Sequence, residues 1–341
     1  MTEPSERREG ARRMTTMRDV ARRAGVSAKT VSRVFNHDPH VAPATKELVE
    51  AALRDLNYVP STLSTTFRSG RAPVIGVAVP DIADPFFGAL AKAVEALAAV
   101  HDMSVVITSL GEDAAREPAI VRSLLRQSLS GLVIAPIAPD QSYLEAWADR
   151  TQLVFVDRRP SGIVADSFTE DDRAGAHTAT RHLVEHGHVR IGFLGDSTMI
   201  PTSRGRLLGY QAALLDSAIE LDESLVVLGA RDRASAADAI AILERLDVPP
   251  TAIFASNARV TMSLVPILHS HRHLALTGFG DFPMADMLDP ALTVIDQDPG
   301  ALGTLAAQRI VDRLAHPQRR FRRHTVLPVE LVERASCLPA V

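Results

Sequence analysis

The fold is decided first by residues 16–36, which read TMRDVARRAGVSAKTVSRVFN. The first apolar residues of this stretch recur at helical spacing: Met17, Val20, Ala21 and Ala24. Thr16 can cap the start of this helix, with Asp19 in its first turn, and Gly25 favours its end. Ser27 can cap a second helix directly after the turn. The stretch therefore predicts two short helices joined by a tight turn.

The second predicted helix has an apolar side and a polar side. Its apolar side is formed by Val31, Val34 and Phe35, and its polar side by Lys29, Ser32, Arg33 and Asn36. A third helix is expected from Pro43, with an inner face of Leu48, Val49, Ala52, Leu53 and Leu56. A helix, a glycine-containing turn and a second helix with a polar outer face match the helix-turn-helix motif of DNA-binding proteins.

The charge of the chain is unevenly distributed, although its net value is only −4. Lysine and arginine outnumber aspartate and glutamate in residues 1–71, whereas the acids are in excess in the remainder. A basic head on an acidic body suggests that only the head meets a polyanion. On charge alone, an ordinary fluctuation of surface charge remains an open alternative. Residues 1–14 are polar without periodicity, and we expect a disordered tail there.

From residue 74 onward, short apolar segments alternate with longer helical ones. Strands are expected at 74–79, 105–108, 132–135, 153–156, 191–194, 225–228, 252–254, 274–277 and 292–295. Helices are expected at 87–100, 114–127, 174–186, 205–217, 234–246 and 301–314. Alternation of this kind predicts doubly wound parallel sheets with helices on both faces, and so many strands suggest two lobes. Ligands of such folds bind at the carboxyl ends of the strands.

The pattern predicts four parts in the chain. They are a tail at 1–14, a helix-turn-helix headpiece at 15–60, one or two further helical turns and a linker at 61–72, and an α/β domain at 73–341. Within that domain we expect a near lobe at about 73–165 and 298–325. A far lobe is expected at about 166–297 and 326–341.

Several classes of protein are disfavoured. No apolar run reaches the roughly 18 residues of a membrane span, and the charged start lacks the core of a secretory signal. Cys337 is the single cysteine, which excludes an internal disulfide. Nucleotide-binding loops, zinc-protease motifs and nucleophile elbows are absent. We therefore expect a cytoplasmic protein that is not an enzyme and has no cofactor. Histidines cluster at 182–188 and 269–273, but without further cysteines we predict no metal site.

Residues 16–36 resemble the headpiece signature of the lac repressor (LacI/GalR) family of bacterial transcription regulators, and residues 57–60 fit its next landmark. The resemblance continues through residues 80–87, 156–158, 182–188, 206–210, 256–257, 278–281 and 297–298. It implies an all-α helix-turn-helix headpiece followed by an α/β periplasmic-binding-protein-like sensor with two lobes.

The resemblance also implies roles in the headpiece. Base-reading positions are occupied by Ala28, Lys29 and Arg33. Lysine and arginine can donate to guanine, whereas alanine offers only a methyl group to thymine. Positions that would contact phosphates are Thr16, Ser27, Thr30, Ser32 and Asn36. An alternative interpretation is that these residues form a solvated helix face.

Residues 61–68 match the hinge helix of that family, which folds on operator DNA and inserts side chains into the minor groove. The usual leucine wedge, with alanine three positions earlier, is replaced here by Phe67 and Ser64. Phenylalanine is an acceptable wedge, so the mechanism is retained. The segment is too short and too rich in β-branched residues to hold a helix unaided.

In the sensor, the resemblance implies an effector pocket lined by Phe86, Asp157, Arg206, Asn257 and Gln297. Charged and amide groups with an aromatic wall suit a sugar or polyol. A surface ion pair remains an alternative for Arg206. Two departures weaken the sugar interpretation. The usual Asn-Asp pair is Asn257-Ala258, and Gly280 replaces a pocket aspartate.

We expect a repressor that binds a palindromic operator as a homodimer, because one headpiece reads only a few base pairs. A small-molecule effector between the lobes would shift their angle and separate the hinges. No heptad tail follows residue 332, so tetramers are not expected. Two alternatives are a solute-binding transport component, which predicts an export signal and no headpiece, and a ligand-binding regulator that acts through protein contact. No membrane partner is expected.

Overall fold

The computed structural model describes residues 16–35, 38–56, 72–268 and 270–337. The chain divides into two compact units, Met1–Gly70 and Arg71–Val341. In the described residues, no helix combines the length and the apolar character that a membrane span needs.

The first unit contains the headpiece, residues 16–56, which is built from three helices. These are α1 (Met17–Ala24), α2 (Ala28–Phe35) and α3 (Pro43–Asp55). Its core consists of Val20, Ala21, Val31, Val34, Val49 and Ala52. Thr16 caps α1 in a reciprocal capping box with Asp19, and Gly25 ends it in the left-handed conformation at φ 68°. The sequence prediction of an all-α headpiece with a tight turn is confirmed.

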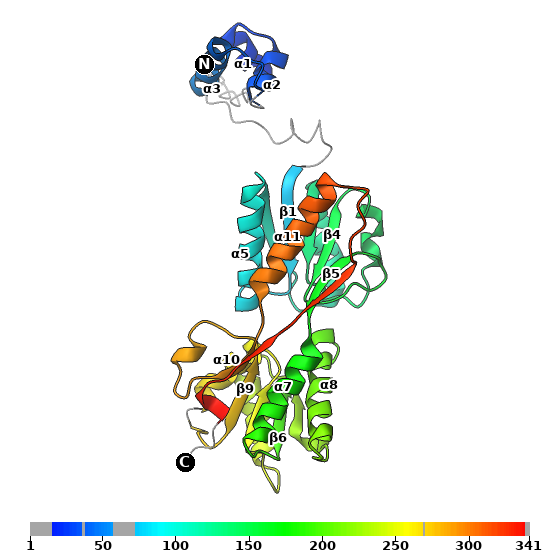
Figure 1. The fold of residues 1–341 in the computed structure, drawn as a ribbon, viewed down its shortest axis with the longest axis vertical. Helices are drawn as coiled ribbons and strands as arrows, with labels where there is room; N and C mark the ends of the chain where they lie inside the picture. Colours follow the sequence, from blue (N-terminus) through cyan, green and yellow to red (C-terminus); the bar gives the residue numbers. More distant parts are fainter. Residues whose placement is uncertain (1–15, 36–37, 57–71, 269, 338–341) are drawn as a thin grey trace, which may run out of the picture. The chain divides into compact units, whose positions relative to one another are not determined.

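The second unit contains two six-stranded sheets, which define its two lobes (Figure 1). The near lobe has the strand order β11-β5-β4-β3-β1-β2, and the far lobe the order β12-β10-β9-β8-β6-β7. Near-lobe strands are β1 (Ala72–Val79), β2 (Ser104–Ser109), β3 (Leu129–Ile134), β4 (Gln152–Val156), β5 (Asp166–Glu170) and β11 (His324–Leu327). Far-lobe strands are β6 (Ile191–Gly195), β7 (Val226–Leu228), β8 (Ala252–Ala255), β9 (Ala275–Phe279), β10 (Thr293–Asp296) and β12 (Glu330–Val332). The described pairs are parallel except β10 with β12.

Helices cover both faces of each sheet. In the near lobe, α5 (Pro85–Val100) and α11 (Pro299–Ala315) pack side by side on one face, and α6 (Glu117–Leu125) covers the other (Figure 1). In the far lobe, α7 (Asp172–Glu185) and α8 (Pro201–Asp216) lie opposite α9 (Arg233–Glu244) and α10 (Ala258–Leu268). Short 3-10 helices are η1 (Ala114–Arg116), η2 (Ser142–Trp147), η3 (Glu223–Leu225), η4 (Ala285–Met287) and η5 (Ala335–Cys337). Both sheets are thus doubly wound, as the sequence predicted.

Within the described residues, the chain passes between the lobes at three places. These are the connections from β5 to α7, from β10 to α11 and from β11 to β12 (Figure 1). Three neighbouring connections hold the carboxyl ends of strands from both sheets in one region. Ligands of doubly wound folds bind at such strand ends.

The first crossing lies later than the sequence suggested. Asp166–Glu170 pairs with β4 and β11 in the near-lobe sheet, whereas we placed the start of the far lobe at about residue 166. The last near-lobe strand likewise extends to Leu327 rather than to about 325. The strand β5 escaped prediction because its sequence, DSFTE, is polar, although all five residues are buried. Asp166 tolerates burial because Arg309 and Arg313 approach it at 3.0 and 2.6 Å.

Candidate DNA-reading face and effector cleft

The outer face of α2 carries the residues that the sequence assigned to base reading. Ala28, Lys29 and Arg33 are all exposed, while Val31 and Val34 on the inner face are buried. Two predicted phosphate contacts, Thr30 and Ser32, are half-buried on the same helix, and Ser27 is exposed directly before it. The helical period therefore separates a core side from a polar side that is open to a partner. Asn36 lies outside the described residues, as do Ser64 and Phe67 of the hinge.

Two of the hydroxyls assigned to phosphate contact already have helix-capping partners. The Ser27 hydroxyl accepts a hydrogen bond from the Thr30 backbone N–H at 3.1 Å, and the two hydroxyl oxygens lie 2.9 Å apart. The Thr16 hydroxyl donates to Asp19 Oδ2 at 2.6 Å. These hydroxyls stabilise the helix starts whether or not DNA is bound. For the Thr16 hydroxyl to donate to a phosphate, it must first give up its hydrogen bond to Asp19.

Arg33 has an intramolecular partner that the sequence analysis missed. Its Nε lies 2.8 Å from Asp38 Oδ2, and both side chains are partly exposed. The other Asp38 oxygen accepts a hydrogen bond from the His40 backbone N–H at 2.9 Å. The hydrogen bond from Arg33 is the main reason that the pKa of Asp38 is held well below its usual range. Arg33 is thus engaged by a carboxylate that is ionised at neutral pH.

In the second unit, Asp157 directly follows β4 at the carboxyl edge of the near-lobe sheet. It is buried and adopts a positive φ of 64°, which is uncommon for a residue other than glycine. Its backbone N–H donates to Phe168 O, which fixes the turn, and its Oδ2 lies 3.1 Å from Arg158 Nε. Strained backbone of this kind is common at binding sites.

Arg206, on α8, is only 5% exposed and is tightly held, so the alternative of a surface ion pair is wrong. Its Nε donates to Asp172 Oδ1 and one terminal nitrogen donates to Ser256 O, both at 2.8 Å. Its guanidinium carbon lies 3.8 Å from the centre of the Phe279 ring. These two bonds use two of the five N–H donors of a guanidinium. Arg206 can therefore keep its position and still donate to a ligand.

Gln297 connects the two lobes, because it lies between β10 and α11 and donates a hydrogen bond to Glu170 Oε2 at the end of β5. The other Glu170 oxygen, Oε1, is buried and has no hydrogen-bond partner among the described residues. The hydroxyl of Ser256, the residue that follows β8, is likewise buried and has no hydrogen-bond partner among the described residues. Buried polar atoms in native proteins nearly always have a hydrogen-bond partner, so these two atoms indicate a position where a ligand can supply one.

Burial changes the ionisation of two acids that the sequence analysis did not assign to the cleft. Loss of hydration raises the pKa of Glu170 to about 8, with a further contribution from the negative charge of Asp157. Burial also raises the pKa of Asp172 to about 6, although the cation of Arg206 opposes this rise. No sequence pattern marks them, because the strand that Glu170 ends is polar and Asp172 stands two residues later, at the start of α7.

Of the five residues that the sequence assigned to the effector, only Phe86 and Gln297 line a cavity of about 320 Å³ between the lobes, which Gly280 also lines. Near-lobe residues of this cavity come from the start of α5, and its far-lobe residues follow β9 and β10, Gln297 among them. Phe86 packs edge-on against Phe87, which is buried in the core, so Phe86 is the member of this pair that faces the cavity, which Phe282 also lines. Gly280 has φ 87°, and a Cβ built there would lie 3.1 Å from Gln297 Oε1. Any side chain at position 280 is therefore strained, and glycine, which has none, leaves more space in the cavity.

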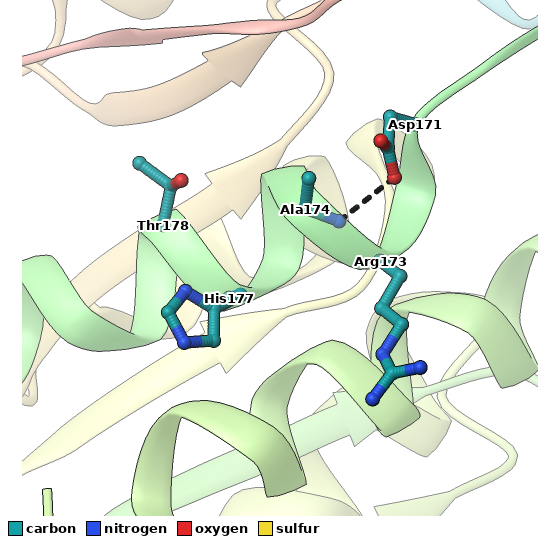
Figure 2. Close-up of a pocket in the computed structure, with 5 residues that line it drawn as sticks. All are labelled: Asp171, Arg173, Ala174, His177 and Thr178. Carbon is teal, nitrogen blue, oxygen red and sulfur yellow. Dashed lines mark hydrogen bonds between the residues drawn. The ribbon is translucent and has the colours of Figure 1, made fainter. Parts of the chain in front are cut away.

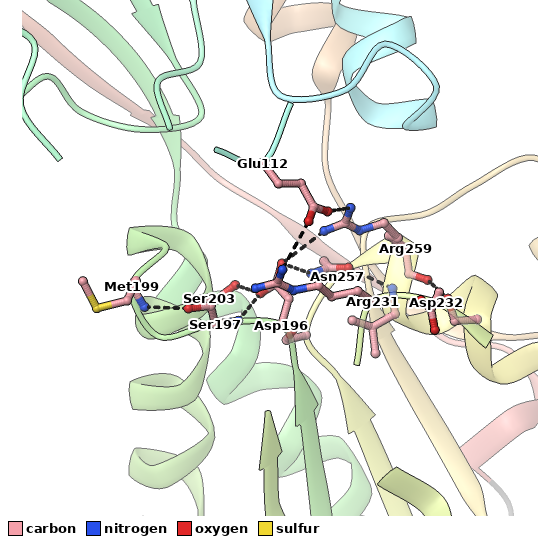
Figure 3. Close-up of polar contacts among 12 residues, drawn as sticks. Glu112, Asp196, Ser197, Met199, Ser203, Arg231, Asp232, Asn257 and Arg259 are labelled. Atoms are coloured by element: carbon pink, nitrogen blue, oxygen red, sulfur yellow. Dashed lines mark hydrogen bonds and ion pairs between the residues drawn. The ribbon is translucent and has the colours of Figure 1, made fainter. Parts of the chain in front are cut away.

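Asn257 has two partners within the protein. Its Oδ1 accepts from the Val260 backbone N–H at the start of α10, and its amide donates to Asp196 Oδ2 at 3.3 Å (Figure 3). Asp196 also accepts from the Ser203 hydroxyl at 2.5 Å. Asn257 thus supports the start of α10, and its proposed role toward an effector is limited to the hydrogen-bonding capacity that remains.

A network of ion pairs connects the lobes beside Asn257 (Figure 3). Glu112, which follows β2 of the near lobe, lies 3.2 Å from Arg231 and 3.0 Å from Arg259, both of the far lobe. Arg259 also lies 3.7 Å from the buried Asp196. A carboxylate from one lobe that pairs with two cations of the other stabilises the arrangement in which the lobes approach each other here.

A second pocket of about 360 Å³ lies on the first turns of α7, next to the end of β5 (Figure 2). It is lined by Asp171, Arg173, Ala174, His177 and Thr178. Asp171 uses one carboxylate oxygen to cap α7 through the Ala174 N–H at 3.0 Å. None of the residues that the sequence assigned to the effector lines this pocket.

Comparison with known proteins gives consistent results for both units. Residues 16–61 match the bacterial regulatory proteins of the lacI family, and residues 180–337 match the periplasmic binding protein-like domain. The chain is 32% identical to the HTH-type transcriptional regulator GalS of Salmonella typhimurium, over 95% of this chain and 96% of GalS. It also resembles the crystal structure of the lac repressor dimer bound to operator and the anti-inducer ONPF. That match has a TM-score of 0.83 and 27% identity, and covers 96% of this chain and 100% of that one. A complex of the regulator CelR with cellobiose has a TM-score of 0.68 and 26% identity over 94% and 99% of the two chains.

A helix-turn-helix headpiece followed by a two-lobed periplasmic-binding-protein-like unit defines a DNA-binding transcription regulator. The chain belongs to the lacI family of bacterial regulatory proteins. The similar proteins are transcriptional regulators and repressors rather than enzymes.

Proposed function

We propose that this chain is a repressor that binds a palindromic operator as a homodimer and responds to a sugar or related polyol held between its lobes. Such a protein acts where bacterial DNA lies, in the cytoplasm. The observation that carries the effector part is the pair of buried polar atoms without partners, Glu170 Oε1 and Ser256 Oγ, at strand ends of both lobes.

The chemistry of the cleft suits a ligand rich in hydroxyl groups. The buried Asp157 offers carboxylate oxygens as acceptors, and Phe86 offers an apolar wall. Arg206 is fixed in place by Asp172 and offers its remaining N–H groups as donors. Hydroxyl groups donate and accept at once, so a polyol can satisfy both kinds of group. The cavity of about 320 Å³ beside Phe86 and Gln297 is of the size that small-molecule sites have, although Asp157, Arg206 and Asn257 do not line it. The cellobiose in the CelR complex supports this class of effector.

The DNA part of the proposal is supported by the exposed face of α2. Lys29 and Arg33 are the donors suited to guanine, and Ala28 leaves room for a thymine methyl group. One short helix reads few base pairs, so two copies on a palindrome are expected. The lac repressor structure, a dimer on operator, supports this arrangement. An effector that binds one arrangement of the lobes more tightly would change the operator affinity by the same differential free energy.

Two variants separate the two activities. Genomic DNA retained by the full chain supplies the operator, and a panel of sugars and polyols supplies effectors. Lys29→Ala should weaken base preference at defined positions by about 1–3 kcal/mol. Asp157→Asn should leave operator affinity intact and remove the effector response. Asparagine is chosen because it tolerates a positive φ, so the turn after β4 is preserved. Loss of DNA binding in Asp157→Asn contradicts the assignment of the cleft.

A further inference from the structure

Two histidines and a glutamate from distant parts of the sequence meet at the far end of α7. His182 and His186 are one helical turn apart, and Glu333 follows β12. One potential ligand atom from each of the three lies within 4.8 Å of the others. Histidines at i and i+4 project from the same face of a helix, which is the spacing that lets two imidazoles share an ion.

His182 is the buried member of the cluster. It is 5% exposed, and its Nε2 has no hydrogen-bond partner among the described residues. A buried imidazole nitrogen without a partner is uncommon in a native structure. Its ring centre lies 4.3 Å from that of His186, the second member of the cluster.

His186 is oriented so that one nitrogen remains for a ligand. Its Nδ1 lies 2.8 Å from the carbonyl oxygen of His182, which can only accept, so Nδ1 carries the proton. In the neutral ring, Nε2 then carries a lone pair, and it lies 3.8 Å from Glu333 Oε1. A backbone carbonyl that holds the other nitrogen is the usual support of a metal-binding histidine.

We propose that His182, His186 and Glu333 bind a divalent transition-metal ion, with zinc as the best fit, in place of the sequence-based prediction of no metal site at these histidines. Two imidazoles and one carboxylate are a recognised set of zinc ligands, and water completes the tetrahedron. At zinc–ligand distances of about 2.0–2.2 Å, the ligand atoms must approach to roughly 3.3 Å of one another. The exposed Glu333 side chain and the partly exposed His186 can make this movement.

A metal ion at this position joins the end of α7 to the segment that follows β12. That segment is the last part of the chain to enter the far lobe. The ion thus cross-links residues about 150 positions apart, and cross-links of long loops stabilise a fold most. This site lies outside the effector cleft, and it stands whether or not the proposed effector is correct.

The test uses the full chain without an affinity tag, titrated with zinc against a competing chromogenic chelator. One zinc ion per chain is expected, together with a higher melting temperature. His186→Gln and Glu333→Gln should each weaken zinc affinity roughly tenfold or more. The matched control is His271→Gln, because the His271 ring likewise bonds a helix carbonyl and a glutamate, Glu244. This control should bind zinc as the wild-type chain does.

Cobalt provides a second readout, because a tetrahedral cobalt ion gives visible absorption bands that an adsorbed ion lacks. The bands should appear with the wild-type chain and disappear in His186→Gln. Absence of saturable zinc binding overturns the proposal. Equal zinc affinity in the wild-type chain, His186→Gln and Glu333→Gln also overturns it, since the ion is then held elsewhere.

Discussion

The buried carboxyl group of Glu170 makes the stability of the chain depend on pH, and Glu170→Gln should remove that dependence. Glu170 is 6% exposed, and burial raises its pKa from an ordinary value of 4.5 to about 8. The folded chain therefore keeps the proton up to about pH 8, whereas the unfolded chain releases it near pH 4.5. Stability from this group is present at low pH and is lost as the pH rises from 4.5 to 8.

The size of the effect follows from the two pKa values. Each pH unit between them changes the free energy of unfolding by about 1.4 kcal/mol. As the pH rises from 6 to 7.5, Glu170 should lower the free energy of unfolding by about 2 kcal/mol. Asp172, with a pKa of about 6, contributes in the same direction but mostly below that range. The pKa of His182 is lowered by burial, so His182 acts in the opposite direction, and only a difference between variants isolates Glu170.

The assay is urea unfolding of the wild-type chain and Glu170→Gln across this pH range. Trp147, the single tryptophan of the chain, reports on the near lobe to which β5 belongs. Glutamine keeps an oxygen that accepts from Gln297 and cannot ionise, so it imitates the protonated acid. Glu145→Gln is the control, because Glu145 is exposed. If the difference in unfolding free energy between the wild-type chain and Glu170→Gln is the same at pH 6 and 7.5, the pKa of Glu170 is not raised by burial.

Three further predictions concern the headpiece, the turn after β9 and the contact between the lobes. Asp38→Ala releases Arg33 and should strengthen binding to random-sequence DNA severalfold in fluorescence anisotropy, with a steeper salt dependence; unchanged binding contradicts a competing ion pair. Gly280→Ala should lower the free energy of unfolding by about 1–2 kcal/mol in urea denaturation, because φ is 87° there; a neutral effect contradicts the strained turn. Glu112→Gln should change stability by less than about 1 kcal/mol but increase the radius of gyration in small-angle scattering, since Arg231 and Arg259 lose their partner across the lobes; an unchanged radius contradicts that role.

Sequence patterns predicted most of the apolar elements but missed elements whose burial depends on distant partners. The strand β5 is one example, because Asp166 is buried against arginines of α11 and Ser167 lies 3.1 Å from His324. No local window contains those partners. The helix α10 was missed for a different reason, since Pro266 interrupts its pattern near the end.

The same limit applies to the candidate site. Residues such as Asp157 and Arg206 were proposed from short sequence motifs shared with the family. The structure adds the groups that pair or hydrogen-bond with them. Glu170 ends the missed strand and Asp172 begins α7 two residues later, so their place beside Arg206 was not visible in the sequence. Glu112 lies more than 100 residues from its partners, and Glu333 lies far from the histidines of α7. Contacts of this range are set by the topology of the two sheets.

Recognition of a specific DNA sequence through the exposed face of α2 is the function that we propose for the headpiece. The most direct measurement selects DNA from a random pool with the full chain and follows binding of the selected sequence as salt increases. We expect a palindrome whose half-sites depend on Lys29 and for which the affinity of the chain falls steeply with salt. Retention of DNA without a shared sequence, or the same selected sequence with Lys29→Ala, would contradict it.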